Sequence, residues 1–364
     1  MTTDYRRYIQ ERNFGCRISD RHTYKGWKLL VLENELLRVT VLPEKGTDIW
    51  EFLYKPTDTD FMWRAPQGLC DRQLYTPTKS VADGNFMDVY EGGWQEIAPN
   101  GGCGCTHRGA EYGQHGEVWN LPWDCVIEKD DVDEVSARLT CRLIKSPLVI
   151  EKRLTLRANE AVLHIDENIT NLSEETVEFM WGHHPAFGAP FLNENCVVDV
   201  PGGKVAVHSF SDNSDRRFEG GQVFDWPNMT TRAGEVVDGS RVPNPECRGS
   251  DELCIMDLRE GWYALTDTRR QVGFALEWDL AVFPYLWYWQ VFGGGEGYPW
   301  YGRSFNCALE PWSSYPLFGL NEAIKHGTQR TLAPGESLGA YIRAVAYSGV
   351  GRVARVEQGR VVPA

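Results

Sequence analysis

The sequence predicts an all-β fold, a large antiparallel β-sandwich, from three observations. Short segments of strand-forming residues recur along most of the chain, and its 36 glycines and 19 prolines punctuate them. Helical periodicity is sparse, and its best example is the short stretch 321–325. Neither an internal repeat nor a proline- or serine-rich linker divides the 364 residues. We therefore expect one domain over residues 1–364, with the first ~30 residues peripheral.

The individual strands are predicted from apolar and β-branched runs bounded by turn-forming residues. The clearest run is 162–170, where Leu163, Ile165 and Ile169 share one face and polar residues dominate the other. Residues 157–160 connect it to the preceding strand as a hairpin. The other strands are expected over residues 36–42, 135–144, 148–156, 177–181, 272–278 and 338–347.

Charge and composition exclude several classes of protein. The formal charge of −14 disfavours nucleic acids and anionic membrane surfaces as partners. No apolar run is long enough to span a membrane. The N-terminal residues lack the apolar region of a secretory signal. A cytoplasmic protein is therefore expected, with its ten cysteines, including the close pair Cys103 and Cys105, as reduced thiols.

Aromatic residues are abundant, and the chain contains 14 tryptophans. Large aromatic side chains are typical of big cores, and most of these tryptophans are expected there. An indole ring also offers a flat apolar surface on which the face of a sugar ring can lie. Tryptophan content therefore favours both a large core and carbohydrate binding.

Three polar clusters stand out against this background. The first is His115, which has Gly113 and Gly116 close to it within residues 112–119. Glycines allow unusual dihedral angles and a close approach of the backbone to a ligand. By itself, this cluster fits either a binding site or a turn that contains a histidine.

The second cluster, residues 181–188, contains His183 and His184 after an expected strand. Adjacent strand residues point to opposite faces, so at most one of the two histidines faces a given cleft. Pro185 holds the backbone of His184 extended. A pair of histidines also fits a metal site, or a purely structural role in a core or turn.

The third cluster, residues 306–312, places Glu310 within an apolar stretch. A carboxylate in such surroundings is costly to ionise unless it has a partner. Its pKa should rise toward neutrality, as a general base requires. A structural glutamate, or one that faces water at the end of a strand, is the alternative interpretation.

In this order, the three clusters resemble the motifs of the aldose 1-epimerase (galactose mutarotase-like) superfamily. That family has a histidine before glycine, a histidine in an H-P-[AY]-F context after a strand, and a glutamate in an L-E-P/T context. The matching segments of this chain are His115-Gly116, His184-Pro185-Ala186-Phe187 and Leu309-Glu310-Pro311. The resemblance covers residues 36–347. It implies a large antiparallel β-sandwich with a sugar in an open cleft on one sheet.

The resemblance also implies a role for each matching residue. Glu310 is the expected general base and His184 the expected general acid. His115 is expected to hydrogen-bond the sugar near its ring oxygen. The family also has a substrate-binding aspartate between the second histidine and the glutamate, for which Asp251 is the best match and Asp257 the rival.

Two further segments bear on the substrate. Residues 285–290 fall where the family has a strand lining the cleft; Trp287 and Trp289 share one face there, and Trp289 is expected to contact the sugar. The family's arginine in an N-R-I motif has no counterpart, because residues 93–99 occupy that stretch. Glu96 is the residue there that we expect to contact a sugar hydroxyl. Because of this departure, the resemblance does not identify galactose or glucose as the substrate.

The expected function is a sugar 1-epimerase (mutarotase), which needs an acid and a base but no cofactor and no metal. Its partner is a small-molecule sugar. One alternative is a non-catalytic carbohydrate-binding protein of the same fold. Another is a hexose-phosphate 1-epimerase, in which Arg64, Arg72 and Arg108 are the candidates to donate hydrogen bonds to the phosphate group. A third is a metalloenzyme; its candidate ligands are His115, Glu117, His183 or His184, and Glu310.

Overall fold

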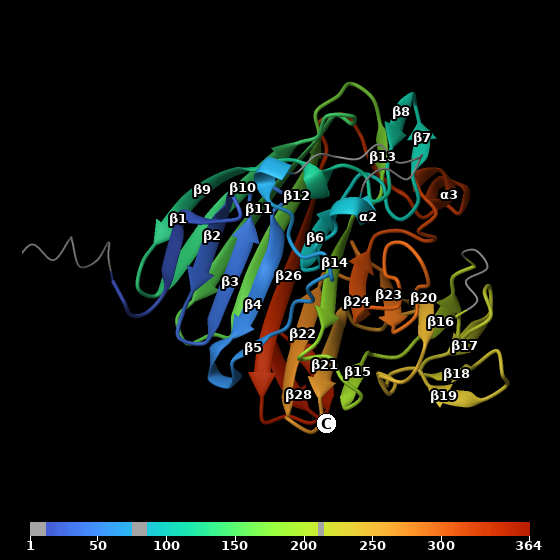
Figure 1. Ribbon diagram of the computed structural model, residues 1–364. Coiled ribbons are helices and arrows are strands. Elements are labelled where there is room, and N and C mark those ends of the chain that lie inside the picture. The colour runs from blue at the N-terminus through green and yellow to red at the C-terminus, as the bar shows by residue number, and fades with distance from the viewer. Residues whose placement is uncertain (1–11, 75–85, 210–214) are drawn as a thin grey trace, which may run out of the picture.

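Two large β-sheets form the body of the protein (Figure 1). The computed structural model describes residues 12–74, 86–209 and 215–364. The first sheet contains twelve strands, in the order β1 (Arg17–Tyr24), β2 (Trp27–Glu33), β3 (Leu37–Leu42), β4 (Asp48–Tyr54), β6 (Trp94–Ile97), β14 (Gly182–Gly188), β24 (Phe305–Trp312), β23 (Tyr285–Phe292), β20 (Gly249–Met256), β16 (Lys204–Val207) and β17 (Val223–Asp225), with β5 (Thr59–Asp60) beside β4.

The second sheet contains eight strands, in the order β15 (Cys196–Asp199), β21 (Trp262–Asp267), β22 (Val272–Trp278), β26 (Ser337–Ser348), β12 (Val162–Asn171), β11 (Leu148–Arg157), β10 (Glu134–Arg142) and β9 (Asp124–Asp130). Its strands pair antiparallel, as do those of the first sheet. The predicted all-β antiparallel sandwich is therefore confirmed.

Smaller elements lie outside the two large sheets. Four two-stranded sheets pair β7 (Cys105–His107) with β8 (Ala110–Tyr112), β13 (Val177–Phe179) with β25 (Arg330–Leu332), β18 (Asn228–Thr230) with β19 (Val236–Asp238), and β27 (Val353–Glu357) with β28 (Arg360–Pro363). The described helices are α2 (Phe86–Val89), α3 (Leu320–Lys325) and the 3-10 turns η1 (Lys55–Thr57), η2 (Arg72–Leu74) and η3 (Val118–Asn120). No helix in these ranges is long and apolar enough to cross a membrane.

The main core lies between the two sheets, where apolar side chains from both of them meet. Phe274 of β22 packs edge-to-face on Phe52 of β4, with 5.2 Å between ring centroids, and lies 5.1 Å from Phe187 of β14. Strand β12 confirms the expected alternation, because Leu163, Ile165 and Ile169 are all buried. The burial of these alternate positions holds the second sheet against the first.

A buried ionic cluster also joins the sheets. Glu96 of β6 and His183 of β14 face Lys152 of β11 and Glu167 of β12. Lys152 Nζ donates to Glu96 Oε2 at 2.7 Å, and His183 Nε2 lies 3.0 Å from Glu167 Oε2. The indole N–H of Trp181 donates to the other Glu96 oxygen at 2.9 Å. Both carboxylate oxygens of Glu96 therefore have hydrogen-bond partners in the core between the two sheets.

The N-terminal segment lies at the edge of the molecule. Strands β1 and β2 form one end of the first sheet, and their Ile18, Leu30 and Leu32 enter the main core. The segment that was expected to be peripheral thus contributes edge strands; residues 1–11 lie outside the described residues. None of the ten cysteines, all of them described, forms a disulfide.

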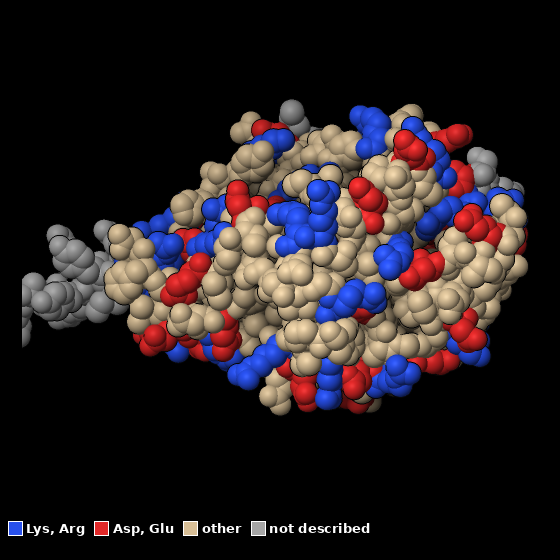
Figure 2. Space-filling model, turned by 90° about the horizontal axis from the view of Figure 1, so that it is seen from below, with Lys and Arg blue, Asp and Glu red and all other residues tan. Residues whose placement is uncertain are grey.

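The face seen from below carries charges of both signs. Figure 2 shows the molecule from below, where basic and acidic side chains are interspersed. This face therefore presents no extended surface of a single sign, of the kind that would attract a polyanion.

Candidate active site

A cavity of about 150 Å³ opens on the face of the first sheet that is turned away from the second. Strands β14, β24, β23 and β20 provide its floor, and the segment around α2 and the turn around His115 provide its walls. Its lining residues are Phe86, Met87, Tyr90, Gly102, Cys103, Gln114, His115, His184, Glu252, Trp287, Trp289, Glu310 and Leu317. Aromatic walls with a few convergent polar groups are typical of small-molecule sites.

Strand register brings the central residues of the floor together. Gly182 lies opposite Trp312, and Ala186 lies opposite Ala308, so His184 of β14 is opposite Glu310 of β24. Cross-strand partners project from the same face of a sheet. The next pair along these strands, Ala186 and Ala308, is fully buried in the core cluster behind the cavity.

His184 and Glu310 contact each other at the floor of the cavity. His184 Nε2 lies 3.3 Å from Glu310 Oε1. The indole N–H of Trp312 donates to the other carboxylate oxygen, Oε2, at 2.9 Å. This bond orients the carboxylate, because it directs Oε1 toward the imidazole and the cavity.

Tyr90, which follows α2, sets the tautomer of His184. Its hydroxyl oxygen lies 3.2 Å from His184 Nδ1. Burial, reinforced by the charge of Glu310, raises the pKa of Tyr90 well above its ordinary value, so the phenol keeps its proton and donates. Nδ1 then accepts, and the remaining ring proton of His184 lies on Nε2, which faces Glu310.

His115 approaches the same point from the wall. Its backbone has a φ of 61°, and Gly116 follows with a φ of 69°. A Cβ at position 116 would lie 2.5 Å from the carbonyl oxygen of Ala98, so only glycine fits there. The backbone N–H of Gly102 donates to His115 Nδ1 at 3.3 Å, which leaves Nε2–H as the donor available to a ligand.

Burial shifts the pKa values of all three groups toward their neutral forms. It lowers the pKa of His184 to about 4 and holds the pKa of His115 well below its usual range. Burial also raises the pKa of Glu310 well above its ordinary value, against the hydrogen bond from Trp312. Burial therefore favours the uncharged forms of the facing groups His184 and Glu310, which can pass a proton to and from two adjacent oxygens of a ligand.

The fit of Trp312 against β14 depends on Gly182. A Cβ at this position would lie 2.3 Å from Cδ2 of the Trp312 ring. We therefore expect Gly182→Ala to lower the free energy of unfolding by about 1–3 kcal/mol, because the tryptophan must move away. Urea unfolding at pH 7 measures this loss. Gly339→Ala in β26 is the matched control, since its nearest neighbour would be at 3.7 Å; equal effects of both variants would contradict the prediction.

Several residues expected at the site from the sequence do line the cavity. They are His184, Glu310, His115 and Trp289, together with Trp287, which shares the face of Trp289. Tyr90 and Glu252 were not expected there. Tyr90 carried no sequence signal, because it lies in a loop region far from the motifs, and only folding brings it to His184.

Two of the expected binding residues lie elsewhere. Glu96 faces the other sheet, bound to Lys152, because it is opposite His183 and not opposite His184. The Asp251 side chain is fully buried and accepts from Arg217 Nε at 2.9 Å.

The strand β20 presents Glu252 to the cavity in place of Asp251. Glu252 is opposite Trp289, and its side chain keeps 34% of its surface exposed. The rival Asp257 follows β20 in an exposed turn, with a φ of 56°. The one-residue difference follows from the pleat, since adjacent residues face opposite sides of a sheet.

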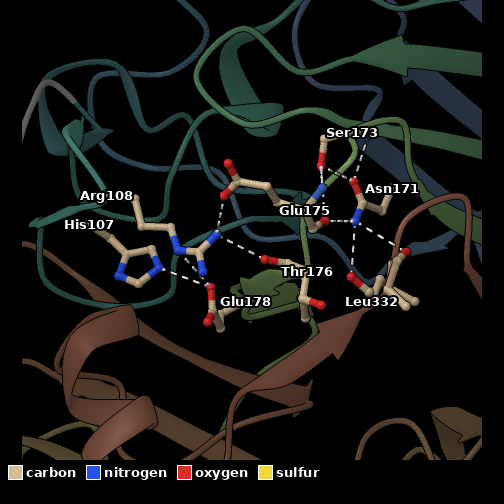
Figure 3. A network of polar contacts seen from close by, with 9 residues as sticks. His107, Arg108, Asn171, Ser173, Glu175, Thr176, Glu178 and Leu332 are labelled. Atoms are coloured by element: carbon tan, nitrogen blue, oxygen red, sulfur yellow. Dashed lines mark hydrogen bonds and ion pairs between the residues drawn. The ribbon is translucent and has the colours of Figure 1, made fainter.

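The three arginines considered as hydrogen-bond donors to a phosphate group form ion pairs outside the cavity. Arg64 pairs with Asp60 at 2.7 Å, and Arg72 pairs with Glu44 at 2.6 Å. Arg108 joins a network with Glu175 and Glu178 (Figure 3). The described residues that line the cavity include no lysine or arginine.

Two of the residues considered as metal ligands, Glu117 and His183, lie outside the cavity. Glu117 accepts from the backbone N–H groups of Ile144 and Lys145, at 2.9 and 3.1 Å, and His183 faces the core. Within the described ranges, the metal-type cluster found is Glu96, Glu167 and His183, all within 4.8 Å. The ammonium of Lys152 already occupies this cluster as its cation.

Comparisons with known proteins place the chain in a structural context. The model of a family described as "Domain of unknown function (DUF4432)" matches residues 24–343. No curated protein matches the sequence.

Solved structures share the fold over nearly their full length. A "putative aldose 1-epimerase" from Klebsiella pneumoniae has a TM-score of 0.70 and 16% identity, over 91% of this chain and 83% of that one. A galactose mutarotase-like protein from Clostridium acetobutylicum has a TM-score of 0.62 and 14% identity, over 92% and 99%. A galactose 1-epimerase from Lactobacillus acidophilus has a TM-score of 0.57 and 14% identity, over 93% and 100%. The predicted galactose mutarotase-like fold is confirmed.

Proposed function

This chain belongs to the family described as Domain of unknown function (DUF4432), a description that names no reaction, and we propose from its cavity that it is a sugar 1-epimerase. The observation that carries the proposal is the contact of His184 Nε2 with Glu310 Oε1, 3.3 Å apart at the cavity floor. The structural neighbours named aldose or galactose 1-epimerases support the same class of reaction.

The chemistry of anomers explains why these two groups must be adjacent. The anomeric hydroxyl and the ring oxygen of a pyranose are bonded to the same carbon. A base removes the hydroxyl proton while an acid protonates the ring oxygen, so the ring opens to an aldehyde. The bond between C1 and C2 turns, and the ring closes on the other face of the carbonyl while both protons return.

The proposed roles follow this requirement. Glu310 acts as the base at the anomeric hydroxyl, and His184 acts as the acid at the ring oxygen. His115 Nε2–H donates to a sugar oxygen, because Gly102 holds its Nδ1 as an acceptor. Trp289 and Tyr90 provide apolar walls for the ring.

The catalytic activity should depend on pH, because the pair of His184 and Glu310 needs one group protonated and the other deprotonated. Burial lowers the pKa of His184 to about 4, so below this value the pair gains a second proton and loses its base. Burial also raises the pKa of Glu310, and above the raised value the pair has lost the proton that its acid donates. We expect kcat/KM to fall as the pH drops toward 4, and to fall again once the pH passes the raised pKa of Glu310. Rates measured by exchange NMR across this range check the profile, and a rate that rises toward pH 4 would contradict it.

The direct test is a screen of freshly dissolved single anomers. Each sugar is followed by polarimetry or exchange NMR with and without the protein, and the set includes neutral, deoxy, acidic and phosphorylated aldoses. Accelerated equilibration of at least one sugar supports the proposal. If every sugar equilibrates at its uncatalysed rate at micromolar protein, the proposal is wrong.

A further inference from the structure

We propose that Glu252 determines the specificity of the cavity: it binds a hydroxyl of the sugar away from the anomeric carbon and rejects sugars with an anionic group there. This inference rests on the proposed function, because it takes the sugar's anomeric carbon to lie at His184 and Glu310. It is carried by the position of Glu252, by its surroundings and by the charges of the lining.

Glu252 faces the cavity from the side opposite Glu310. Trp287 of β23 lies opposite Glu310 of β24, and Trp289 lies opposite Glu252 of β20. Strand β23 separates the two glutamates, and they are offset by two residues along it, so their backbones are about 12 Å apart across the floor. A sugar whose anomeric carbon contacts Glu310 can therefore extend over Trp289 toward Glu252.

A second histidine lies beside this carboxylate. His208 Nδ1 lies 3.4 Å from Glu252 Oε2, and the imidazole is buried while the carboxylate keeps its exposure to the cavity. The His208 ring stacks on Phe318 with centroids 3.9 Å apart and packs edge-to-face on Trp287 at 5.0 Å. Aromatic rings therefore pack on two sides of this imidazole, next to the Glu252 carboxylate.

The charges of the lining favour an uncharged group beside Glu252. Among its described residues are two carboxyl groups and no ammonium or guanidinium group. Arg216 acts on Glu252 electrostatically, but it lines a neighbouring hollow with Arg217 and Arg232. An anionic group of a ligand would thus meet a like charge inside a partly desolvated cavity, which is unfavourable.

The protonation state of the Glu252 carboxyl also suits the binding of hydroxyl groups. Burial raises the pKa of Glu252 to about 7, and burial lowers the pKa of His208 to about 3. At neutral pH the Glu252 carboxyl is present in both forms, so it can accept a hydrogen bond from a sugar hydroxyl or donate one to it.

The test compares hexoses with the corresponding uronic acids, which differ only by a carboxylate at C6. Glu252→Gln has the same shape but no charge. For hexoses, we expect it to raise KM by about tenfold or more and to change kcat little, because a hydrogen bond to a charged group is lost. For the uronic acids, we expect kcat/KM relative to the hexoses to rise by about tenfold, because the like charge is removed. Rates are measured near pH 7 by exchange NMR.

The matched control is Glu178→Gln. Glu178 also contacts an imidazole, with Oε2 at 3.3 Å from His107 Nε2 (Figure 3), but it is not among the residues that line the cavity. Hexose selectivity and KM should stay as in the wild type. Thermal unfolding shows whether both variants are folded.

A second measurement separates this inference from the proposed function. Sugar binding is followed by the fluorescence of the tryptophans, two of which line the cavity. If wild-type protein binds hexoses over uronic acids and Glu252→Gln removes the preference, the inference stands, even when no anomer is interconverted. If anomers are interconverted but Glu252→Gln changes neither KM nor selectivity, the inference is wrong and the proposed function remains. If the protein binds no sugar, both are wrong.

Discussion

Replacing Glu310 with glutamine is expected to slow anomer interconversion by about 10²–10⁴-fold, the contribution that a positioned general base makes. Glutamine has the same shape, and its amide oxygen can still accept from the indole N–H of Trp312, a bond of 2.9 Å in the wild type. Its amide cannot take the proton of the anomeric hydroxyl. The loss should therefore appear in kcat, while sugar binding changes much less.

His184→Asn should cause a loss of similar size. The double variant should be little slower than either single one, because the two groups act as a unit and their effects are not additive. The controls are Glu178→Gln and His107→Asn, which alter a pair at 3.3 Å outside the cavity. Exchange NMR measures the rates of all these variants, and circular dichroism checks that they are folded. A rate for Glu310→Gln close to that of the wild type would remove Glu310 from the mechanism.

Replacing Lys152 with methionine is expected to lower the free energy of unfolding by about 3–5 kcal/mol, the loss typical of a broken buried ion pair. Lys152 Nζ lies 2.7 Å from Glu96 Oε2, and their side chains are 6% and 0% exposed. Burial disfavours the charged form of Glu96, but Lys152 outweighs it and lowers the pKa of this carboxyl. Without the ammonium, a carboxylate is left buried without its compensating charge between the two sheets.

A surface lysine provides the control that separates the loss of the buried ion pair from the loss of any lysine side chain. Lys129 pairs with Glu134 at 3.1 Å on the surface, and Lys129→Met should cost less than about 1 kcal/mol. Lys152→Met combined with Glu96→Gln should be less destabilised than the sum of the two single variants, since the buried charge is then removed as well. Urea unfolding at pH 7 measures all four variants. A loss below 1 kcal/mol for Lys152→Met would show that the cluster does not hold the sheets together.

The sequence by itself was sufficient for the fold class and for the residues at the cavity floor. Period-two burial is a local property of a strand, so residues 162–170 revealed their buried face without knowledge of their neighbours. The same alternation separates His183 from His184, and the proline that follows identifies His184 as part of the motif. With Glu310 in its own motif, two strands distant in sequence were assigned to one site.

Only the tertiary structure decided which carboxylates reach the cavity. Both faces of β20 are covered by protein, so its sequence does not reveal which face borders the ligand, and Asp251 and Glu252 could not be distinguished. Glu96 lies on the same sheet as His184, but its face is set by its pairing with His183. Tyr90 and His208 lie outside regular strands and meet their partners only after the chain has folded. Alternation along a strand is local, whereas the side of the sheet that stays open to solvent is decided by every element packed on it.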